Sequence, residues 1–539
     1  FNRTRLPVMR LCVAFASVGL CMDNGLALTP PMGWRSWNAF YLQIDQEMIE
    51  ANIEMLADKG RTVRGVHKSL ADVGYSDAGL DDGWQACGAG VNGSFHDHSG
   101  RPVVNTTRFP SLKAMVAKAH SLGITAGWYG NNCDCYESGF GEAWVDQEMS
   151  GDVASTVEYG FDSIKLDGCG QELNLTRWEK LFNASGKAVL LENCHWGNDA
   201  PTLDWCPFHM FRSSPDITST PASWTSMYLN LQTMNRFSAV SRPGCWAYPD
   251  MLETGNFLRY QEDRANFGAW AITSSPLILS LDLRNKSMVD RVWEIITNEE
   301  AIAVNQDWAG EPGGLAVSQS PGYSGFPWLV ACDAMDKAQR GWSYNHTSKR
   351  VQVGKSCLDW SFASHSDPGF LALAPCDAAS TPQTFHYKQG SLTPDGAQCA
   401  APYNYQWHGG PGLSLQACEK QMNDGHKDQH FTITGDGRMV HQNGQCVAAK
   451  ASAPLQADLT QVWTKKLTGQ KQGIFAINAD KTTDHMVEVA LPPGVTFKVR
   501  DVWTRKDTGE AKGTLRLKVP HRDSAFVVVT PVAESLFFQ

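Results

Sequence analysis

The chain lacks any long run of basic residues. Its 46 Lys and Arg are outnumbered by 56 Asp and Glu, which gives a formal net charge of −10 and a pI near 5.8. Nucleic-acid binding needs a clustered basic face, so this balance argues against a nucleic-acid partner. No apolar stretch is long enough to form a membrane-spanning helix, including the short N-terminal run. We therefore expect neither a nucleic-acid partner nor a membrane span.

The N-terminal segment, residues 1–27, has the features of a secretory signal. Basic residues precede an apolar run over residues 11–22, and polar residues follow it. This run is too short to span a bilayer. Fifteen cysteines fit an oxidising compartment. We predict a secreted or lumenal glycoprotein (lysosomal, vacuolar or extracellular) with seven N-x-Ser/Thr sequons, at Asn2, Asn92, Asn105, Asn174, Asn183, Asn285 and Asn345.

Residues 28–308 alternate short strand-like runs with helix-like ones. This pattern predicts an α/β domain of the (β/α)8 TIM-barrel type, with a doubly wound sheet as the alternative. In a barrel, the polar residues that follow successive strands gather at one end. Strands are expected at 124–129, 163–167, 188–192 and 277–281, and helices at 45–58, 111–122 and 290–303.

The C-terminal part of the chain has a different pattern. Residues 464–539 alternate apolar and polar residues over short runs separated by Pro, Gly and Asp. Together with residues 309–324, they are predicted to form an antiparallel β-sandwich. Residues 325–463 then form an insert within this sandwich. At the C-terminal end of the insert, residues 461–463 (Gln-Val-Trp) match the Gln-x-aromatic motif of the repeat. We nevertheless favour their assignment to the sandwich.

The insert contains an internal repeat. Two cysteine pairs have equal spacing, and each is followed by Gln and then by an aromatic residue two positions later. This pattern resembles the ricin-type β-trefoil lectin repeat, and only Cys357-Leu358-Asp359 keeps the Cys-x-Asp opening of a lobe. The alternative is a repeat that serves only as a spacer. A circularly permuted trefoil predicts the bridges Cys332–Cys446, Cys357–Cys376 and Cys399–Cys418.

The segment 161–169 is predicted to be a short buried strand that ends at Gly168. Residues two apart on a strand share one face, so Lys165 and Asp167 point the same way. A lysine beside a carboxylate keeps that carboxylate ionised, as a carboxylate nucleophile requires. The alternative is a structural ion pair at the end of a strand.

Other polar clusters also follow predicted strands. Asp81 and Asp82 stand before Gly and Trp, an arrangement that suits a sugar, and a metal site is the weaker interpretation because no further ligand lies nearby. Arg212 can orient Asp216, whose pKa an apolar surround would raise toward that of a general acid. The alternative for this pair is an ordinary surface ion pair. Asp250 ends a tight loop.

The run His96-Asp97-His98 offers metal-ligating side chains as well. It lacks a third ligand at the usual spacing. We therefore predict that this run is a solvated loop rather than a metal site.

Five motifs in order resemble glycoside hydrolase family 27, which holds the α-galactosidases and α-N-acetylgalactosaminidases. The resemblance covers about residues 28–318 and 464–532. It implies a barrel, a C-terminal sandwich and hydrolysis with retention of anomeric configuration. The motifs are residues 32–38, 81–84, 165–169, 249–252 and 303–307.

The resemblance also implies roles for residues of this chain. Asp167 is similar to the nucleophile and Asp216 to the general acid/base of a retaining enzyme. No cofactor and no metal are implied, because two carboxylates and a bound sugar suffice. Matches to sugar-binding positions are Asp81 and Asp82 (O6 and O4), Lys165 (O3 and O4), Arg212 (O2), Trp37 and Tyr129 (aromatic walls), and Asp250 (a further carboxylate).

His195 departs from the family pattern. Galactosidases commonly have Glu at this position and the N-acetylgalactosamine enzymes have Ser, in a loop that reads the substituent at C2. An imidazole can bond a 2-hydroxyl, whereas its bulk disfavours an acetamido group. We therefore expect an α-galactoside substrate, and Asp81 argues against a pentopyranose. The alternatives are an α-N-acetylgalactosaminidase of the same fold and an inactive lectin-like protein, although Asp167 and Asp216 are intact.

Disulfides near the site are implied by the same resemblance. Either Cys133 or Cys135 is expected to pair with Cys169, and Cys87 can take the remaining member. A second glycan at the trefoil-like module and a homo-oligomer are further possibilities.

Cys194–Cys206 is a second candidate pair. It would leave Cys245 as a free thiol or an intermolecular bridge.

Overall fold

The structure is a computed structural model of the 539-residue chain. None of its described helices is long and apolar enough to cross a membrane. Most of the predicted signal segment lies outside the described residues. These are residues 20–21, 24–217, 222, 224–318, 327–333, 335, 340–360, 369–407, 410–418, 429–442, 444–449, 460–480 and 483–532.

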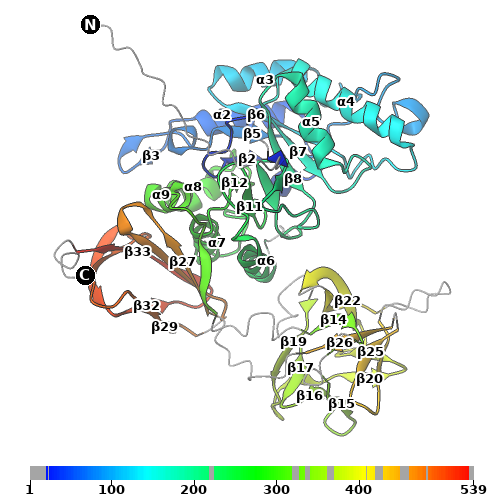
Figure 1. Cartoon of the computed structure of the whole chain (residues 1–539), viewed down its shortest axis with the longest axis vertical. Coiled ribbons are helices and arrows are strands. Elements are labelled where there is room, and N and C mark those ends of the chain that lie inside the picture. Colours follow the sequence, from blue (N-terminus) through cyan, green and yellow to red (C-terminus); the bar gives the residue numbers. More distant parts are fainter. Residues whose placement is uncertain are drawn as a thin grey trace.

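Eight parallel strands form the first unit and confirm the predicted barrel (Figure 1). Their order is β11-β10-β8-β7-β6-β5-β2-β12. The sheet closes because Leu252, just after β11, forms a parallel bridge with Leu279 of β12. The strands are β2 (Met32–Arg35), β5 (Asp77–Gly79), β6 (Thr125–Gly130), β7 (Ser163–Asp167), β8 (Leu190–Cys194), β10 (Met210–Arg212), β11 (Trp246–Tyr248) and β12 (Leu277–Leu279).

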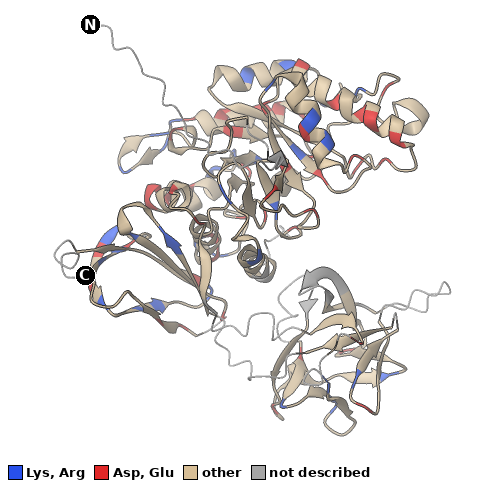
Figure 2. Ribbon diagram, viewed as in Figure 1, with Lys and Arg blue, Asp and Glu red and all other residues tan. Residues whose placement is uncertain are grey.

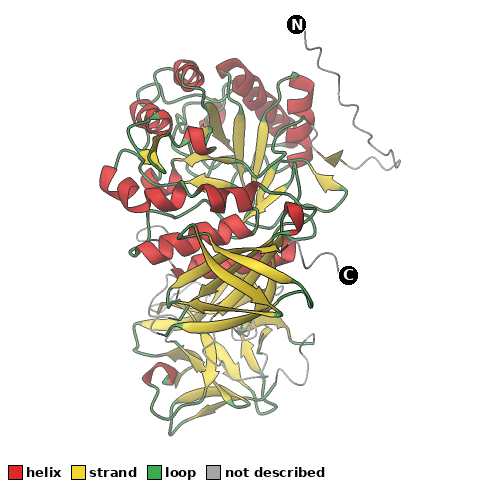
Figure 3. Cartoon of the chain, turned by 90° about the vertical axis from the view of Figure 1, so that its left-hand side faces the viewer, coloured by secondary structure: helices red, strands yellow, loops and turns green. Residues whose placement is uncertain are grey.

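Helices surround this barrel (Figure 3). One expected helix, at 290–303, is in fact two, because the Asn298 side chain accepts the N–H groups of Glu300 and Ala301 and so starts a new helix. The helices are α1 (Trp37–Phe40), α2 (Gln46–Ala57), α3 (Leu112–Ser121), α4 (Glu142–Tyr159), α5 (Leu175–Ser185), α6 (Trp224–Phe237), α7 (Tyr260–Ile272), α8 (Lys286–Ile296) and α9 (Glu299–Gln306).

The barrel strands hold a buried charged cluster. Arg35 lies 2.5 Å from Asp77 and 3.8 Å from Glu192. A Cβ added at Gly79 would lie 2.7 Å from the Arg35 side chain, so β5 needs glycine there. Burial of such a charge is tolerated only when it is paired, as it is here.

The C-terminal sheet confirms the predicted sandwich. It is antiparallel, in the order β13-β27-β28-β33-β30-β31-β32-β29. Ser318 pairs with Gln461, so residues 461–463 belong to this sheet, which resumes before the expected boundary at 464. The strands are β13 (Gly314–Ser318), β27 (Thr460–Lys466), β28 (Gln472–Asn478), β29 (His485–Ala490), β30 (Thr496–Asp501), β31 (Lys506–Lys512), β32 (Thr514–Val519) and β33 (Asp523–Pro531).

The insert is built from short antiparallel strands with its own apolar core. Trp342, Phe385 and Phe431, one from each expected lobe, share that core. Its bridges are Cys332–Cys446, Cys357–Cys376 and Cys399–Cys418, the three that the repeat predicts. The trefoil assignment itself stays a prediction.

The strands of the insert are β14 (Trp328–Ala331), β15 (Trp342–Asn345), β16 (Arg350–Val353), β17 (Ser356–Asp359), β18 (Gly369–Phe370), β19 (Ala372–Pro375), β20 (His386–Lys388), β21 (Ser391–Thr393), β22 (Gln398–Trp407), β23 (Gly410–Ala417), β24 (Phe431–Ile433), β25 (Met439–His441) and β26 (Gln445–Ala448).

Candidate active site

The residues predicted to form the site lie at or just after the carboxyl ends of barrel strands. This is the end at which barrel enzymes carry their chemistry. The parallel register therefore places side chains from remote parts of the sequence around one centre. They are Trp37 (after β2), Asp81 and Asp82 (after β5), Tyr129 (β6), Lys165 and Asp167 (β7), His195 (after β8), Arg212 and Asp216 (β10 and beyond) and Asp250 (after β11).

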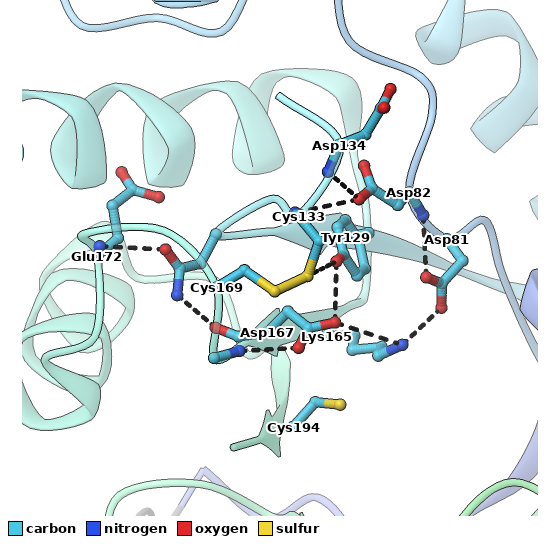
Figure 4. Close-up of a disulfide and its surroundings, with 12 residues drawn as sticks. Asp81, Asp82, Tyr129, Cys133, Asp134, Lys165, Asp167, Cys169, Glu172 and Cys194 are labelled. Carbon is cyan, nitrogen blue, oxygen red and sulfur yellow. Dashed lines mark hydrogen bonds and ion pairs between the residues drawn. A yellow bond between two sulfur atoms is a disulfide. The ribbon is translucent and has the colours of Figure 1, made fainter. Parts of the chain in front are cut away.

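Asp167 is the buried carboxylate at the centre of this group. Its Oδ2 accepts a hydrogen bond of 2.8 Å from the Tyr129 hydroxyl, and its Oδ1 accepts one of 2.8 Å from the Gly168 N–H (Figure 4). Lys165 Nζ lies 3.8 Å from Oδ2. Burial raises the pKa of Asp167, and Lys165 opposes that rise. Lys165 therefore lowers the pKa of Asp167, as expected. Burial raises this pKa by more, so the net shift is upward.

Lys165 is held more closely by Asp81 than by Asp167. Its Nζ donates to Asp81 Oδ2 at 2.8 Å and lies 5.1 Å from the centre of the Tyr129 ring. Burial works against the charged lysine, but the carboxylates of Asp81 and Asp167 raise its pKa well above the usual value. The ammonium group is therefore charged and links two carboxylates.

Asp82 has both carboxylate oxygens occupied by the protein. Oδ2 accepts from the N–H groups of Cys133 and Asp134, at 3.1 and 2.8 Å. Oδ1 accepts from the Gln85 side chain at 2.6 Å and from the Gly83 N–H at 2.8 Å. Asp82 thus fixes the loop after β6 in addition to any contact with a sugar.

Arg212 joins the two remaining carboxylates. Its Nη2 donates to Asp216 Oδ1 at 2.9 Å, and its Nη1 lies 3.0 Å from Asp250 Oδ1. Asp250 is buried, which raises its pKa to about 7 against the opposing effect of Arg212. The Asp216 side chain is 53% exposed, so the apolar surround expected for it is not present. Asp216 is the accessible carboxylate and Asp250 the enclosed one.

His195 lies in a tightly packed loop after β8. Its Nδ1 is 2.6 Å from Asp199 Oδ2, while its buried Nε2 has no hydrogen-bond partner among the described residues. A Cβ added at Gly168 would lie 3.2 Å from the Trp196 ring and 3.4 Å from His195 Cα. This loop therefore lies directly against the residue that follows Asp167.

Trp37 begins α1, directly after β2. Its ring lies 5.5 Å from that of Tyr41, and it packs against the apolar cluster that contains Trp246 and Met251.

Two disulfides tie together the loops around Asp167. Cys133 bonds to Cys169, and Cys87 takes the remaining Cys135. Asn131, which the sequence did not single out, accepts the Glu172 N–H at 3.1 Å and donates to the Asp167 carbonyl. The only available signal was its place in a polar run that directly follows a buried strand.

The predicted Cys194–Cys206 bridge is wrong. Cys206 bonds to Cys245, which is therefore neither free nor intermolecular, and Cys194 is a buried free thiol. Cys194 ends β8 inside the site, where its sulfur accepts a hydrogen bond of 3.6 Å from Arg212. Burial raises the pKa of this thiol well above its usual value, so it stays protonated.

The prediction of a solvated loop at His96 is also wrong. His96 is completely buried, and carboxylates from three other segments surround its ring: the loop of Glu137, helix α4 and the loop of Glu172. They were missed because they lie 41 to 76 positions further along the chain, beyond the reach of any spacing rule.

Comparisons with known proteins match this architecture. The α-galactosidase A family matches residues 29–307, and the α-galactosidase C-terminal β-sandwich domain matches residues 457–529. α-Galactosidase 3 of Arabidopsis thaliana is 32% identical over 308 residues, which are 54% of this chain and 64% of that protein. The α-galactosidase of Coffea arabica is 32% identical over 305 residues, covering 54% and 74% of the two chains.

Solved structures share the fold. α-Galactosidase I from Mortierella vinacea has a TM-score of 0.56 at 19% identity, with 94% of this chain and 98% of that chain covered. The α-galactosidase of Saccharomyces cerevisiae has a TM-score of 0.57 at 15% identity, with 94% and 99% covered.

Asp167 ends β7 and Asp216 follows β10, with β8 between these two strands, and this barrel with its site matches the glycoside hydrolase class. The chain belongs to the α-galactosidase family, glycoside hydrolase family 27.

Proposed function

We propose that the protein is a retaining exo-α-galactosidase that removes terminal α-D-galactosyl residues by double displacement. The observation that carries this proposal is the pairing of a buried Asp167, supported by Tyr129 and Lys165, with an accessible Asp216 beside Arg212. Burial and the negative charge of Asp216 both raise the pKa of Asp167, so the two carboxylates lie within electrostatic reach of each other.

The reaction takes two balanced steps. Asp167 attacks the anomeric carbon while the bond from C1 to the leaving oxygen breaks, and Asp216 gives that oxygen its proton. Water then attacks C1 of the glycosyl ester, Asp216 takes a proton from the water, and Asp167 leaves as a carboxylate. Two inversions at C1 give net retention.

The sugar is proposed to lie between the walls formed by Trp37 and Tyr129. Asp81 and Asp82 would hold O6 and O4, and Lys165 would hold O3 and O4. Lys165 is charged and has Asp81 beside it, which leaves its other protons for substrate hydroxyls. Arg212 would lie near O2, and Asp250 would hold Arg212 in place.

Galactose is the favoured sugar because of His195. Asp199 fixes one ring nitrogen, so the unpartnered Nε2 is available to a 2-hydroxyl. An acetamido group would need space that the imidazole fills. The runner-up function, α-N-acetylgalactosaminidase activity, requires that this loop open.

The test compares p-nitrophenyl α-galactoside with the α-N-acetylgalactosaminide on the full chain. We expect hydrolysis of the galactoside and loss of about 10³-fold or more in Asp167→Ala. Equal rates of hydrolysis in the wild type and in Asp167→Ala, or no hydrolysis of either substrate by the wild type, would refute the enzyme assignment. A higher kcat/KM on the N-acetyl substrate would refute the galactose preference.

The insert is proposed to bind a second glycan through the lobe that Cys357 opens. Asp359 in that lobe accepts a hydrogen bond of 3.2 Å from Gln383, which the Pro375 carbonyl also orients. Glycan-array binding by the full chain should be lost in Asp359→Ala and kept in Asp395→Ala, which changes an exposed aspartate elsewhere in the insert. Retained binding in Asp359→Ala would refute this lobe as the site.

The six disulfides indicate a compartment that is not the reducing cytosol. We propose secretion or delivery to a lumenal compartment, with N-glycans at the sequons. Treatment of protein from the native source with a peptide N-glycosidase should reduce its apparent mass.

A further inference from the structure

A second cluster of ionisable side chains lies beside the active site and takes no part in the proposed hydrolysis. His96 comes from the loop after β5, Glu137 from the loop after β6, and Glu172 from the loop after β7. Helix α4 adds Glu148 and Asp152. All five are buried, between 0% and 8% exposed.

The charges in this cluster are unbalanced. Four carboxyl groups face one imidazole, and no Lys or Arg side chain forms an ion pair with any of them among the described residues. Burying several carboxylates without a counter-charge is very costly. A protonated His96 supplies only one positive charge, so the described side chains leave most of the four carboxyl groups without a counter-charge when they are ionised.

The hydrogen bonds divide the cluster into two sides of the His96 ring. On one side, Nδ1 lies 3.0 Å from Glu137 Oε2, and Glu137 Oε1 is fixed by the Phe95 N–H at 2.9 Å. On the other side, Nε2 lies 3.2 Å from Asp152 Oδ1. A carboxylate that holds one ring nitrogen while the other faces oxygen ligands is the usual arrangement of a metal-binding histidine.

Glu172 supplies an independent indication of a ligand. Its side chain is buried, and its Oε1 has no hydrogen-bond donor among the described residues. One ligand atom each from His96, Asp152 and Glu172 lie within 4.8 Å of one another. A single ion can therefore contact all three.

We propose that His96 Nε2, Asp152 and Glu172 bind a divalent transition-metal cation, Mn²⁺ or Zn²⁺, with Glu137 orienting the imidazole. Two carboxylates favour Mn²⁺ and the imidazole favours Zn²⁺, whereas Ca²⁺ takes oxygen ligands only. The ion would neutralise the buried acids.

The site would be structural, and it would act on the nucleophile through one residue. Asn131 accepts the Glu172 N–H and donates to the Asp167 carbonyl, so the loop that binds the ion also positions the end of β7 (Figure 4). Metal binding would hold the loops after β5 and β7 against helix α4.

The experiment uses the untagged full chain after dialysis against EDTA and return to metal-free buffer. Calorimetric titration with MnCl2, ZnCl2 and CaCl2 is followed by mass-spectrometric metal analysis and thermal melting. We expect one equivalent of Mn²⁺ or Zn²⁺ and a melting temperature at least 5 °C higher with the metal, by mass action on the folded state. Binding of Ca²⁺ alone, or of none of the three, would overturn the proposal.

Variants test the ligand set without relying on activity. Asp152→Asn and Glu172→Gln should weaken binding at least 100-fold, and Glu137→Gln about 10- to 100-fold as an orienting residue. Glu158→Gln, an exposed residue of the same helix α4, should bind as the wild type does. Unchanged affinity in both Asp152→Asn and Glu172→Gln would overturn the assignment, and melting curves of the metal-free variants show that they are folded.

Discussion

Asp167 experiences two opposing effects, because burial favours its protonated form while Lys165 and the Tyr129 hydroxyl favour the carboxylate. As the proposed nucleophile, Asp167 must be ionised, so this balance is expected to set the lowest pH at which hydrolysis occurs. Lys165 also pairs with Asp81, so its ammonium group links the carboxylates of Asp81 and Asp167.

Replacing this lysine should therefore change the pH profile as well as the rate. In Lys165→Met, the pKa of Asp167 should rise further, and the acid limb of the kcat/KM profile should move to higher pH. We also expect a loss of about 10²-fold or more at the optimum, since a buried charged partner is removed. The measurement is kcat/KM on the nitrophenyl galactoside from pH 3 to 8.

Lys187→Met is the matched control, because Lys187 pairs with Asp162 away from the site. It should leave the profile unchanged. An unmoved acid limb in Lys165→Met would show that this lysine does not tune the nucleophile.

His195 gives a second prediction for a single residue. Asp199→Asn removes the carboxylate that fixes the His195 ring and should raise KM for the galactoside about 3- to 10-fold, the worth of one oriented hydrogen bond. Asp204→Asn, in the same connection, is the control. Equal KM values in the two variants would mean that Asp199 has no orienting role.

The carboxylates at strand ends were predictable because each follows a recognisable apolar run. The pairing of Cys206 with Cys245 and the burial of His96 were not, since both depend on contacts between segments remote in sequence. Exposure was also unpredictable: the solvent access of Asp216 follows from the path of its loop, which spacing does not report.

Among the elements, the loops after β6 and β7 depend most on covalent support. The Cys133–Cys169 bridge joins the loop that Asp82 holds to the strand end that carries Asp167. The β6 and β7 strands themselves fell close to their expected positions, and β7 matched its expected bounds. Their loops follow no periodic pattern, so the sequence alone left the partner of Cys169 open.

Removing this bridge should reduce activity. The double change Cys133→Ser with Cys169→Ser should lower the free energy of unfolding by about 2–4 kcal/mol and lower kcat strongly, because the loops around Asp167 become free to move. The control, Cys357→Ser with Cys376→Ser, removes a bridge of the insert and should leave kcat unchanged. A fall in kcat of the same size in both would show that the effect is one of general instability.

For the whole molecule, acidic and basic residues are interspersed along the ribbon of the barrel (Figure 2), and several buried acids have raised pKa values. Burial raises the pKa of both Asp250 and Asp263 to about 7. Between pH 4 and 7, the folded state therefore binds more protons than the unfolded state, whose carboxyls titrate near 4. The free energy of unfolding falls as the pH rises through this window.

We expect the melting temperature to be about 3–5 °C higher at pH 5 than at pH 7.5. His209, whose pKa burial lowers to about 4, works in the opposite direction. Asp263→Asn should flatten the dependence, and calorimetric melting across this range measures it. A melting temperature that rises from pH 5 to 7.5 would contradict the prediction.

The insert leaves and re-enters the sandwich at neighbouring strands, since Ser318 of β13 pairs with Gln461 of β27. Its two attachment points are thus one strand spacing apart, about 4.8 Å. Lengthening such a connection costs little chain entropy. Module exchange during evolution, or grafting by an engineer, can therefore replace the insert without altering the β-sheet that supports the barrel.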